Sequence, residues 1–124
     1  MRAHVVDAYI SAQPPQFAAA LTDLRTCLCD LLPDHIEVMS YAMPGLRQPA
    51  QGGKMIIGYA AFAKHIGLYP HSGSVIDKIN CAPFKTSKSG IMFTPDHLPP
   101  RTLIAAIIAQ RQRELAAGYP PARG

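Results

Sequence analysis

The sequence predicts a two-layer α+β domain, in which an antiparallel sheet is covered on one face by N-terminal and C-terminal helices. Apolar residues with helical spacing lie near both ends of the chain, whereas short segments with alternating apolar residues lie between them. Strands that follow one another in sequence usually pair as an antiparallel meander. Helices at both ends of such a meander bury their apolar stripes against one of its faces.

The helices are predicted from three apolar stripes. A short helix ends near Gln13, a second begins at the prolines of residues 14–15 and ends at Pro33, and a third runs from the prolines of residues 99–100 to Gly118. We expect Arg111 and Arg113 of the last helix to face solvent. The stripes are Val5, Val6, Tyr9 and Ile10; Phe17, Leu21, Leu24, Leu28, Leu31 and Leu32; and Leu103, Ile104, Ile107, Ile108, Arg111 and Leu115.

The strands are predicted from alternation and from turn residues. Residues 36–43 alternate, and Pro44-Gly45 is expected to turn the chain into a loop over residues 47–53. Residues 54–62 are apolar on both faces, as in a central strand that is covered on two sides. Further strands are expected at residues 65–69, at Phe84 and at residues 91–93, with a short helix over residues 74–80.

Composition indicates a single globular domain. The 124 residues suffice for one hydrophobic core, and 48% hydrophobic with 16% charged residues is ordinary for such a domain. We expect residues 1–118 to form the domain and residues 119–124 to be a flexible tail. The net charge of +4 weakly favours anionic partners. Nucleic acid is not expected as a partner, because the lysines and arginines are scattered along the chain.

The cysteines and the apolar runs indicate a cytoplasmic protein. Three cysteines cannot all pair within one chain, and Cys27 and Cys29 lie on different sides of a predicted helix. We therefore expect reduced thiols. Asp7 interrupts the N-terminal segment before the apolar core of an export signal, so no such signal is expected. No apolar run approaches the length that spans a membrane.

Polar side chains gather beside predicted strands at two places. The strand at residues 65–69 puts His65 and Tyr69 on one face, with Lys64 at its edge. The loop of residues 85–90 is basic and rich in hydroxyl groups, and its side chains and backbone N–H groups suit an anion, although the P-loop spacing is absent. If the fold brings the two places together, they form one site. Its predicted ligand-binding residues are Tyr41, Lys64, His65, Tyr69, Lys85, Ser87 and Lys88.

Each of these places has a simpler interpretation. The face of His65 and Tyr69 also suits a packing surface or a dimer contact, and the loop of residues 85–90 also suits a solvated basic turn. Catalysis is not favoured, because the sequence contains no nucleophile elbow and no paired-carboxylate motif. Zinc is not indicated, because His65, His71 and Cys81 lack the spacing of zinc ligands.

A series of short motifs resembles the YdhG-like family of small bacterial domains, which are largely of unknown function. Some members are described as frataxin-like intracellular iron chaperones. The motifs follow the family order over almost the whole chain. They are residues 6–10 with Pro14, Leu24-Arg25, residues 40–44, residues 61–70, residues 85–90 with Phe93, and residues 98–100 with Leu103-Ile104.

The resemblance implies an α+β fold comparable to that of frataxin, and it implies no settled activity. The resemblance also implies that the protein binds iron. The candidate residues for holding the metal are Asp23, Asp30 and Asp34. This chain has Ala42 where the family usually has glycine, and the segment from residue 72 to residue 82 is shorter than usual.

Three functions therefore stay open at the level of sequence. The first is a non-enzymatic small binding protein that resembles the iron chaperones. The second is a pocket or an enzyme for a small anionic ligand, and the third is a module that forms a homodimer through the second face of the sheet.

Overall fold

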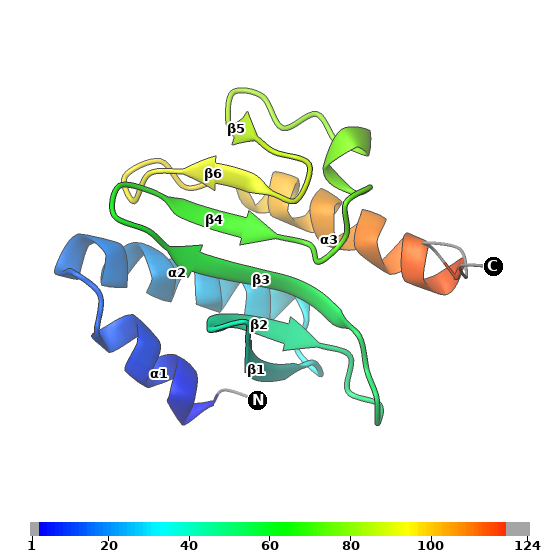
Figure 1. The fold of residues 1–124 in the computed structure, drawn as a ribbon, viewed down its shortest axis with the longest axis horizontal. Coiled ribbons are helices and arrows are strands. Elements are labelled where there is room, and N and C mark those ends of the chain that lie inside the picture. The colour runs from blue at the N-terminus through cyan, green and yellow to red at the C-terminus, as the bar shows by residue number, and fades with distance from the viewer. Residues whose placement is uncertain (1–2, 119–124) are drawn as a thin grey trace.

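The computed structural model describes residues 3–118, so the tail expected at residues 119–124 lies outside the described residues. The helices are α1 (His4–Ser11), α2 (Pro15–Leu31) and α3 (Arg101–Ala116), with a short 3-10 helix, η1 (Ile76–Lys78). The strands are β1 (Ile36–Ser40), β2 (Met43–Arg47), β3 (Met55–Ala61), β4 (Ile66–Tyr69), β5 (Lys85–Thr86) and β6 (Ile91–Phe93). Figure 1 shows their arrangement.

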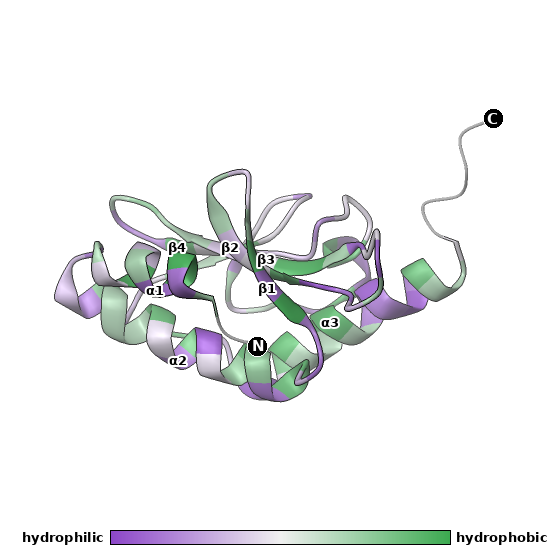
Figure 2. Ribbon diagram, turned by 90° about the horizontal axis from the view of Figure 1, so that it is seen from below, coloured by the Kyte–Doolittle hydropathy of each residue, from purple (hydrophilic) through white to green (hydrophobic). Residues whose placement is uncertain are grey.

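The six strands form one antiparallel sheet in the order β1-β2-β3-β4-β6-β5. Figure 2 shows the helices on one side of this sheet, and no helix of residues 3–118 on the other. The predicted two-layer α+β fold is therefore confirmed. The meander changes order only at its end, where β6 lies between β4 and β5. The predicted helix over residues 74–80 shortens to the single turn of η1.

The first hairpin differs from the prediction. Pro44 and Gly45 do not turn the chain, because both lie inside β2, where they pair with Met39 and Val38 of β1. The turn is instead at Tyr41 and Ala42, whose φ angles are 53° and 61°. Positive φ at both central residues is typical of the tight hairpin turn that matches the twist of the strands.

The core lies between the sheet and the helices. Strand pairing sets Leu46 opposite Ile57 and Tyr59 opposite Leu68, and each of these side chains is at most 2% exposed. Their partners from the helices are also fully buried; they include Leu21, Leu24, Leu28, Ile104 and Ile107. The apolar stripes of α2 and α3 thus pack where the sequence predicted.

The other face of the sheet is covered differently from the prediction, which had β3 covered on both sides. Gly58 of β3 is buried by a side chain and not by a helix. A Cβ atom on Gly58 would lie 2.8 Å from Nε2 of His71, so the imidazole ring rests directly on the strand. Tyr69 covers Gly67 and Gly90 in the same way, since a Cβ atom on Gly90 would lie 2.5 Å from its ring. We call this face of the sheet, opposite the helices, the open face.

Arg111 also departs from the prediction. Its side chain is buried, and its Nε and Nη2 atoms donate hydrogen bonds to the carbonyl oxygen of Met55 at 3.0 and 2.8 Å. Met55 lies at a bulge where β3 contains one more residue than β2. The guanidinium therefore satisfies a carbonyl at the irregular start of β3. Arg113 is exposed, as expected.

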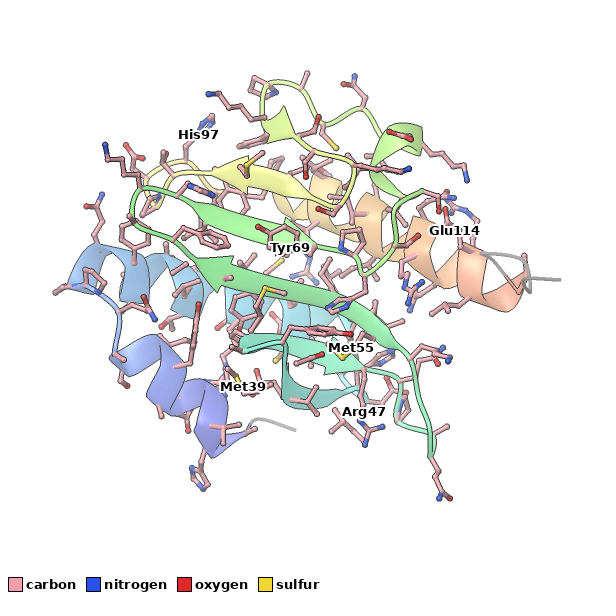
Figure 3. The ribbon with its side chains drawn as sticks, in the orientation of Figure 1. Met39, Arg47, Met55, Tyr69, His97 and Glu114 are labelled. Atoms are coloured by element: carbon pink, nitrogen blue, oxygen red, sulfur yellow. The ribbon has the colours of Figure 1, made fainter. Side chains whose placement is uncertain are left out.

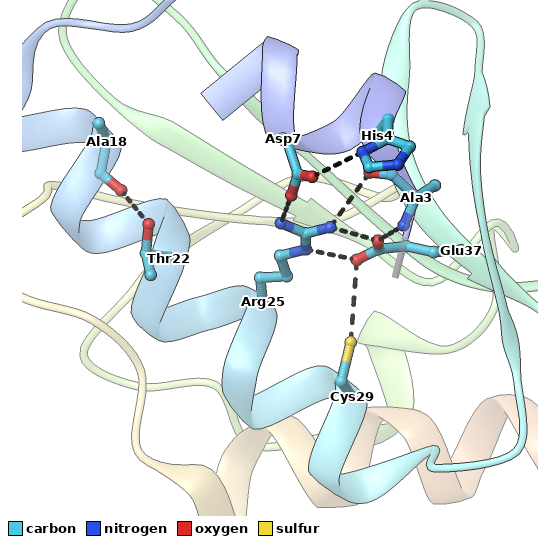
Figure 4. Close-up of polar contacts among 8 residues, drawn as sticks. All are labelled: Ala3, His4, Asp7, Ala18, Thr22, Arg25, Cys29 and Glu37. Carbon is cyan, nitrogen blue, oxygen red and sulfur yellow. Dashed lines mark hydrogen bonds and ion pairs between the residues drawn. The ribbon is translucent and has the colours of Figure 1, made fainter. Parts of the chain in front are cut away.

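A buried ion pair joins α1, α2 and β1. Figure 4 shows Arg25 of α2 between Glu37 of β1 and Asp7 of α1. Arg25 donates from Nε and Nη2 to the two carboxylate oxygens of Glu37 at 2.7 and 2.6 Å, and from Nη1 to Asp7 at 2.5 Å. The same Nη2 donates to the carbonyl oxygen of Ala3, whose N–H donates to Glu37 at 2.7 Å.

The charges in this cluster are mutually stabilised. The side chains of Arg25 and Glu37 are 7% and 2% exposed, so solvent does little to screen their paired contact. The hydrogen bonds with Glu37 raise the pKa of Arg25. The hydrogen bond from Arg25 lowers the pKa of Asp7.

Replacing Ala42 by glycine should stabilise the protein. Ala42 adopts a left-handed conformation that costs a non-glycine residue about 1–2 kcal/mol, and the added flexibility of the unfolded chain offsets about half of the gain. We expect Ala42→Gly to raise the free energy of unfolding by about 0.5–1 kcal/mol, measured by urea denaturation. The control is Ala19→Gly on the exposed side of α2, which should lower it by about 1 kcal/mol. A loss of stability in Ala42→Gly would contradict the assignment of the turn.

Removing Arg25 should destabilise the protein strongly. Arg25→Ala leaves the buried Glu37 carboxylate without its charged partner, and such changes cost about 3–5 kcal/mol. Urea denaturation followed by circular dichroism measures the loss. Arg113→Ala is the matched control, because Arg113 is exposed and its side chain donates to Gln110 on its own helix. It should change stability by less than about 0.5 kcal/mol. Equal losses in the two variants would show that the cluster does not hold the helices to β1.

Candidate functional site

The structure brings together three of the residues that the sequence singled out. Lys64, His65 and Lys85 line one surface pocket of about 530 Å³, which we call the anion pocket. This volume lies within the range of pockets that bind small molecules. The complete lining is Lys64, His65, Pro83, Phe84, Lys85, Met92, Phe93, Thr94 and His97.

Local backbone structure places the basic residues at the end of the sheet. The turn from β3 to β4 is closed by a hydrogen bond from the N–H of Phe62 to the carbonyl oxygen of His65 at 2.8 Å, which leaves Lys64 at its tip. The ring of Phe62 stacks on that of His65 with 4.8 Å between centroids. Lys85 of β5 pairs with Met92 of β6, which sets the lysine beside the apolar floor of the pocket.

His97 and Phe84 complete the pocket, and the sequence did not single out either as a site residue. His97 follows β6 in a turn, where its N–H donates to the carbonyl oxygen of Thr94 at 3.0 Å. Its ring lies 5.0 Å from the ring of Phe84, which in turn makes an edge contact with Phe93 at 6.3 Å. Figure 3 shows His97 at one end of the sheet and Tyr69 on the open face. An exposed histidine in a loop carries no periodic signal, so only the fold connects it to Lys64 and Lys85.

The charges around the anion pocket are positive. None of the described residues that line it is an aspartate or a glutamate. The nearby Asp96 accepts a hydrogen bond from Thr94 Oγ1 at 2.6 Å and is not part of the lining. Between residues 38 and 93, Asp77 is the only acid, against six lysines and arginines. The sheet half of the molecule therefore favours anions.

The other predicted site residues lie elsewhere. Tyr69 lies flat over Gly67 and Gly90 on the open face, and burial raises its pKa. Ser87 sits in an exposed turn, where its N–H donates to the carbonyl oxygen of Gly90 at 2.8 Å. The stem of Lys88 lies beside Gly73, since a Cβ atom there would be 3.4 Å from Lys88 Cε. Tyr41 is 88% exposed at the tip of the first hairpin.

The three carboxylates considered for iron do not all meet at one place. Asp23 and Asp30 line a separate pocket with Cys27 and Arg101, and Asp30 is 3.8 Å from the Arg101 guanidinium. Asp34 contacts His35 at 2.9 Å. Among residues 3–118 no group of three or more histidine, cysteine, aspartate or glutamate side chains is placed to hold a metal ion.

A second polar cluster ties α3 to the loop that follows β4. Glu114 is buried and accepts hydrogen bonds from Ser74 at 2.7 Å, from Ser72 and Gln110 at 3.1 Å, and from Lys78 at 3.3 Å. Burial alone would raise the pKa of Glu114, but these hydrogen bonds outweigh it and lower the pKa. Figure 3 shows Glu114 at the opposite end of the sheet from His97, so this cluster is separate from the anion pocket.

Comparison with solved structures identifies the class of fold. The chain has the α+β fold of a protein from the DUF1801 family. That protein is YdhG from Bacillus subtilis, whose crystal structure matches with a TM-score of 0.75 and 17% sequence identity over 96% of this chain and 94% of that chain. The match confirms the resemblance to YdhG at the level of the fold.

Comparison of the sequence itself gives no match: no family model and no curated protein matches the chain. None of the helices in residues 3–118 is long and apolar enough to cross a membrane.

Proposed function

We propose that the protein is a non-enzymatic binding protein that holds a small anionic ligand in the anion pocket. The observation that carries this proposal is the convergence of Lys64, His65, Lys85 and His97 from three separate segments of the chain on one pocket. Two ammonium groups attract a carboxylate or a phosphate, and the imidazole nitrogens of the histidines add hydrogen-bonding groups.

The lining of the pocket favours binding over catalysis. Its polar groups are lysine ammonium, imidazole and the hydroxyl of Thr94, which is already bonded to Asp96. A ligand would therefore meet a positive rim and an apolar floor of Met92, Phe84 and Phe93. Small-molecule sites commonly combine an apolar surface with a few polar groups that fix orientation. No disulfide joins Cys27, Cys29 or Cys81 among the described residues, which agrees with the cytoplasmic location that we propose.

The role of an iron chaperone has less support. It rests on the family resemblance. Asp23 and Asp30 line one pocket that Asp34 does not reach, and Asp30 and Asp34 contact Arg101 and His35. Asp7 and Glu37, the other acids near this end of the chain, bond to Arg25. The anion pocket is therefore the function that the geometry supports best.

Association of two copies through the open face is a second candidate, and the composition of that face favours it. Met43, Met55 and Met92 are half-buried there beside Tyr69, with no helix of the described chain over them. Methionine adapts its shape to a partner surface. Light scattering at millimolar concentration should then detect a dimer, and a monomer under these conditions would contradict this candidate.

Removing Lys85 should weaken anion binding. In Lys85→Ala the pocket loses one of its two ammonium groups, and a charge-assisted hydrogen bond contributes about 1.5–3 kcal/mol, so affinity should fall about tenfold or more. The measurement is a titration with inorganic phosphate, citrate and acetate, followed by NMR. In the unmodified protein the amide signals of Lys64, His65, Lys85 and His97 should shift.

Lys54→Ala is the matched control for charge. Lys54 is an exposed lysine in the loop between β2 and β3, outside the anion pocket. Its removal lowers the net charge equally and should leave affinity within about twofold, because a distant exposed charge is screened by salt. Equal losses in Lys54→Ala and Lys85→Ala, or shifts spread over the whole surface, would contradict a site at the pocket.

A further inference from the structure

A second pocket adjoins the anion pocket. It has a volume of about 550 Å³ and lies between the segment after η1 and the first turns of α3, and we call it the α3 pocket. The two pockets share Pro83, Phe84 and His97. The complete lining of the α3 pocket is Lys78, Ile79, Asn80, Ala82, Pro83, Phe84, His97, Leu98, Pro100, Thr102, Leu103 and Ala106.

The boundary between the two pockets is a pair of rings. Phe84 and His97 lie 5.0 Å apart with an angle of 38° between their planes. Phe84 is half-buried and His97 is exposed, so the pair stands at the surface and not within the core. A ligand that lies across this pair contacts both pockets at once.

Apolar surface forms the larger part of the walls of the α3 pocket, although Lys78, Asn80 and Thr102 also line it. Ile79, Leu98, Leu103 and Ala106 supply apolar surface from both sides. Two of its polar groups already have partners, because the Lys78 ammonium donates to Glu114 at 3.3 Å and the Asn80 side chain accepts from the N–H of Ala82 at 3.2 Å. In contrast, Lys64 and Lys85 place their charges around the neighbouring anion pocket.

We infer that the ligand of this site is an amphipathic anion, a carboxylate or phosphate head group carried on a hydrocarbon chain. This inference rests on the anion pocket proposed above and extends it. The head group lies between Lys64 and Lys85, with His97 beside it. The hydrocarbon chain passes over Phe84 and fills the α3 pocket against Leu103 and Ala106 of α3.

The test is a calorimetric titration with butanoate, hexanoate and octanoate, each below the concentration at which it forms micelles. Each methylene that enters the α3 pocket should tighten binding about fourfold, the equivalent of about 0.8 kcal/mol. Octyl phosphate compared with octanoate identifies the preferred head group. Octan-1-ol should bind at least tenfold more weakly than octanoate, because it lacks the charge.

Two variants separate the head from the chain. Ala106→Trp places a bulky ring in the α3 pocket, so the gain in affinity from butanoate to octanoate should shrink, while the affinity for butanoate stays within twofold. Ala106→Met is a smaller change with the same expected direction, in case the tryptophan disturbs α3. Lys85→Ala should weaken both ligands by the same factor. Ala19→Trp, on the exposed side of α2, is the control and should change neither affinity.

The outcomes distinguish this inference from the proposed function. Butanoate and octanoate that bind equally, both dependent on Lys85, would overturn the amphipathic ligand and leave the anion pocket standing. A dependence on chain length that stays undiminished in both Ala106→Trp and Ala106→Met would also overturn it, because the chain would then lie outside the α3 pocket. Absence of binding by every carboxylate, by octyl phosphate and by inorganic phosphate would overturn both proposals.

Discussion

The buried contact between Arg25 and Glu37 is the interaction on which the rest of the structure depends. It joins the middle of α2 to the edge strand β1, and through Asp7 and Ala3 it also holds α1. Contacts between apolar side chains hold helices against a sheet without fixing a unique position, since they have little directionality. The paired hydrogen bonds of a guanidinium and a carboxylate do fix one. Once α2 is held in this position, its leucines pack against the sheet, and the anion pocket lies at one end of that sheet.

The fold separates charge between its two layers. The sheet half is basic, and most of the acids lie on or next to the helices of the other layer, where Asp7 and Asp30 contact arginine. On the open face, aromatic rings over glycines replace a second helical layer, which is possible because Gly58, Gly67 and Gly90 leave room for a ring against the backbone. The basic pocket thus lies at the end of a sheet that has helices of residues 3–118 on one face only.

Periodicity predicted the elements well and their connections less well. The apolar stripes of α2 and α3 predicted both helices, because a helix that buries one side has apolar residues at helical spacing in its sequence. The first hairpin was misplaced because Pro44-Gly45 is a common turn signal and Tyr41-Ala42 is not. Pairing across β1 and β2 overrode local preference there and holds two non-glycine residues at positive φ. Arg111 was misread for a similar reason, because a carbonyl left free by a distant bulge decides its burial.

The sequence by itself determined the α+β class, the apolar sides of the helices, and Lys64, His65 and Lys85 as residues of interest. Local spacing contains that information. Only the tertiary structure decided that these three meet, that Phe84 and His97 join them, and that Tyr69 and Lys88 do not. The reason is physical: the site is assembled from the β3–β4 turn, β5 and the loop after β6, whose proximity depends on the order of strands across the sheet. No spacing along the chain records that order.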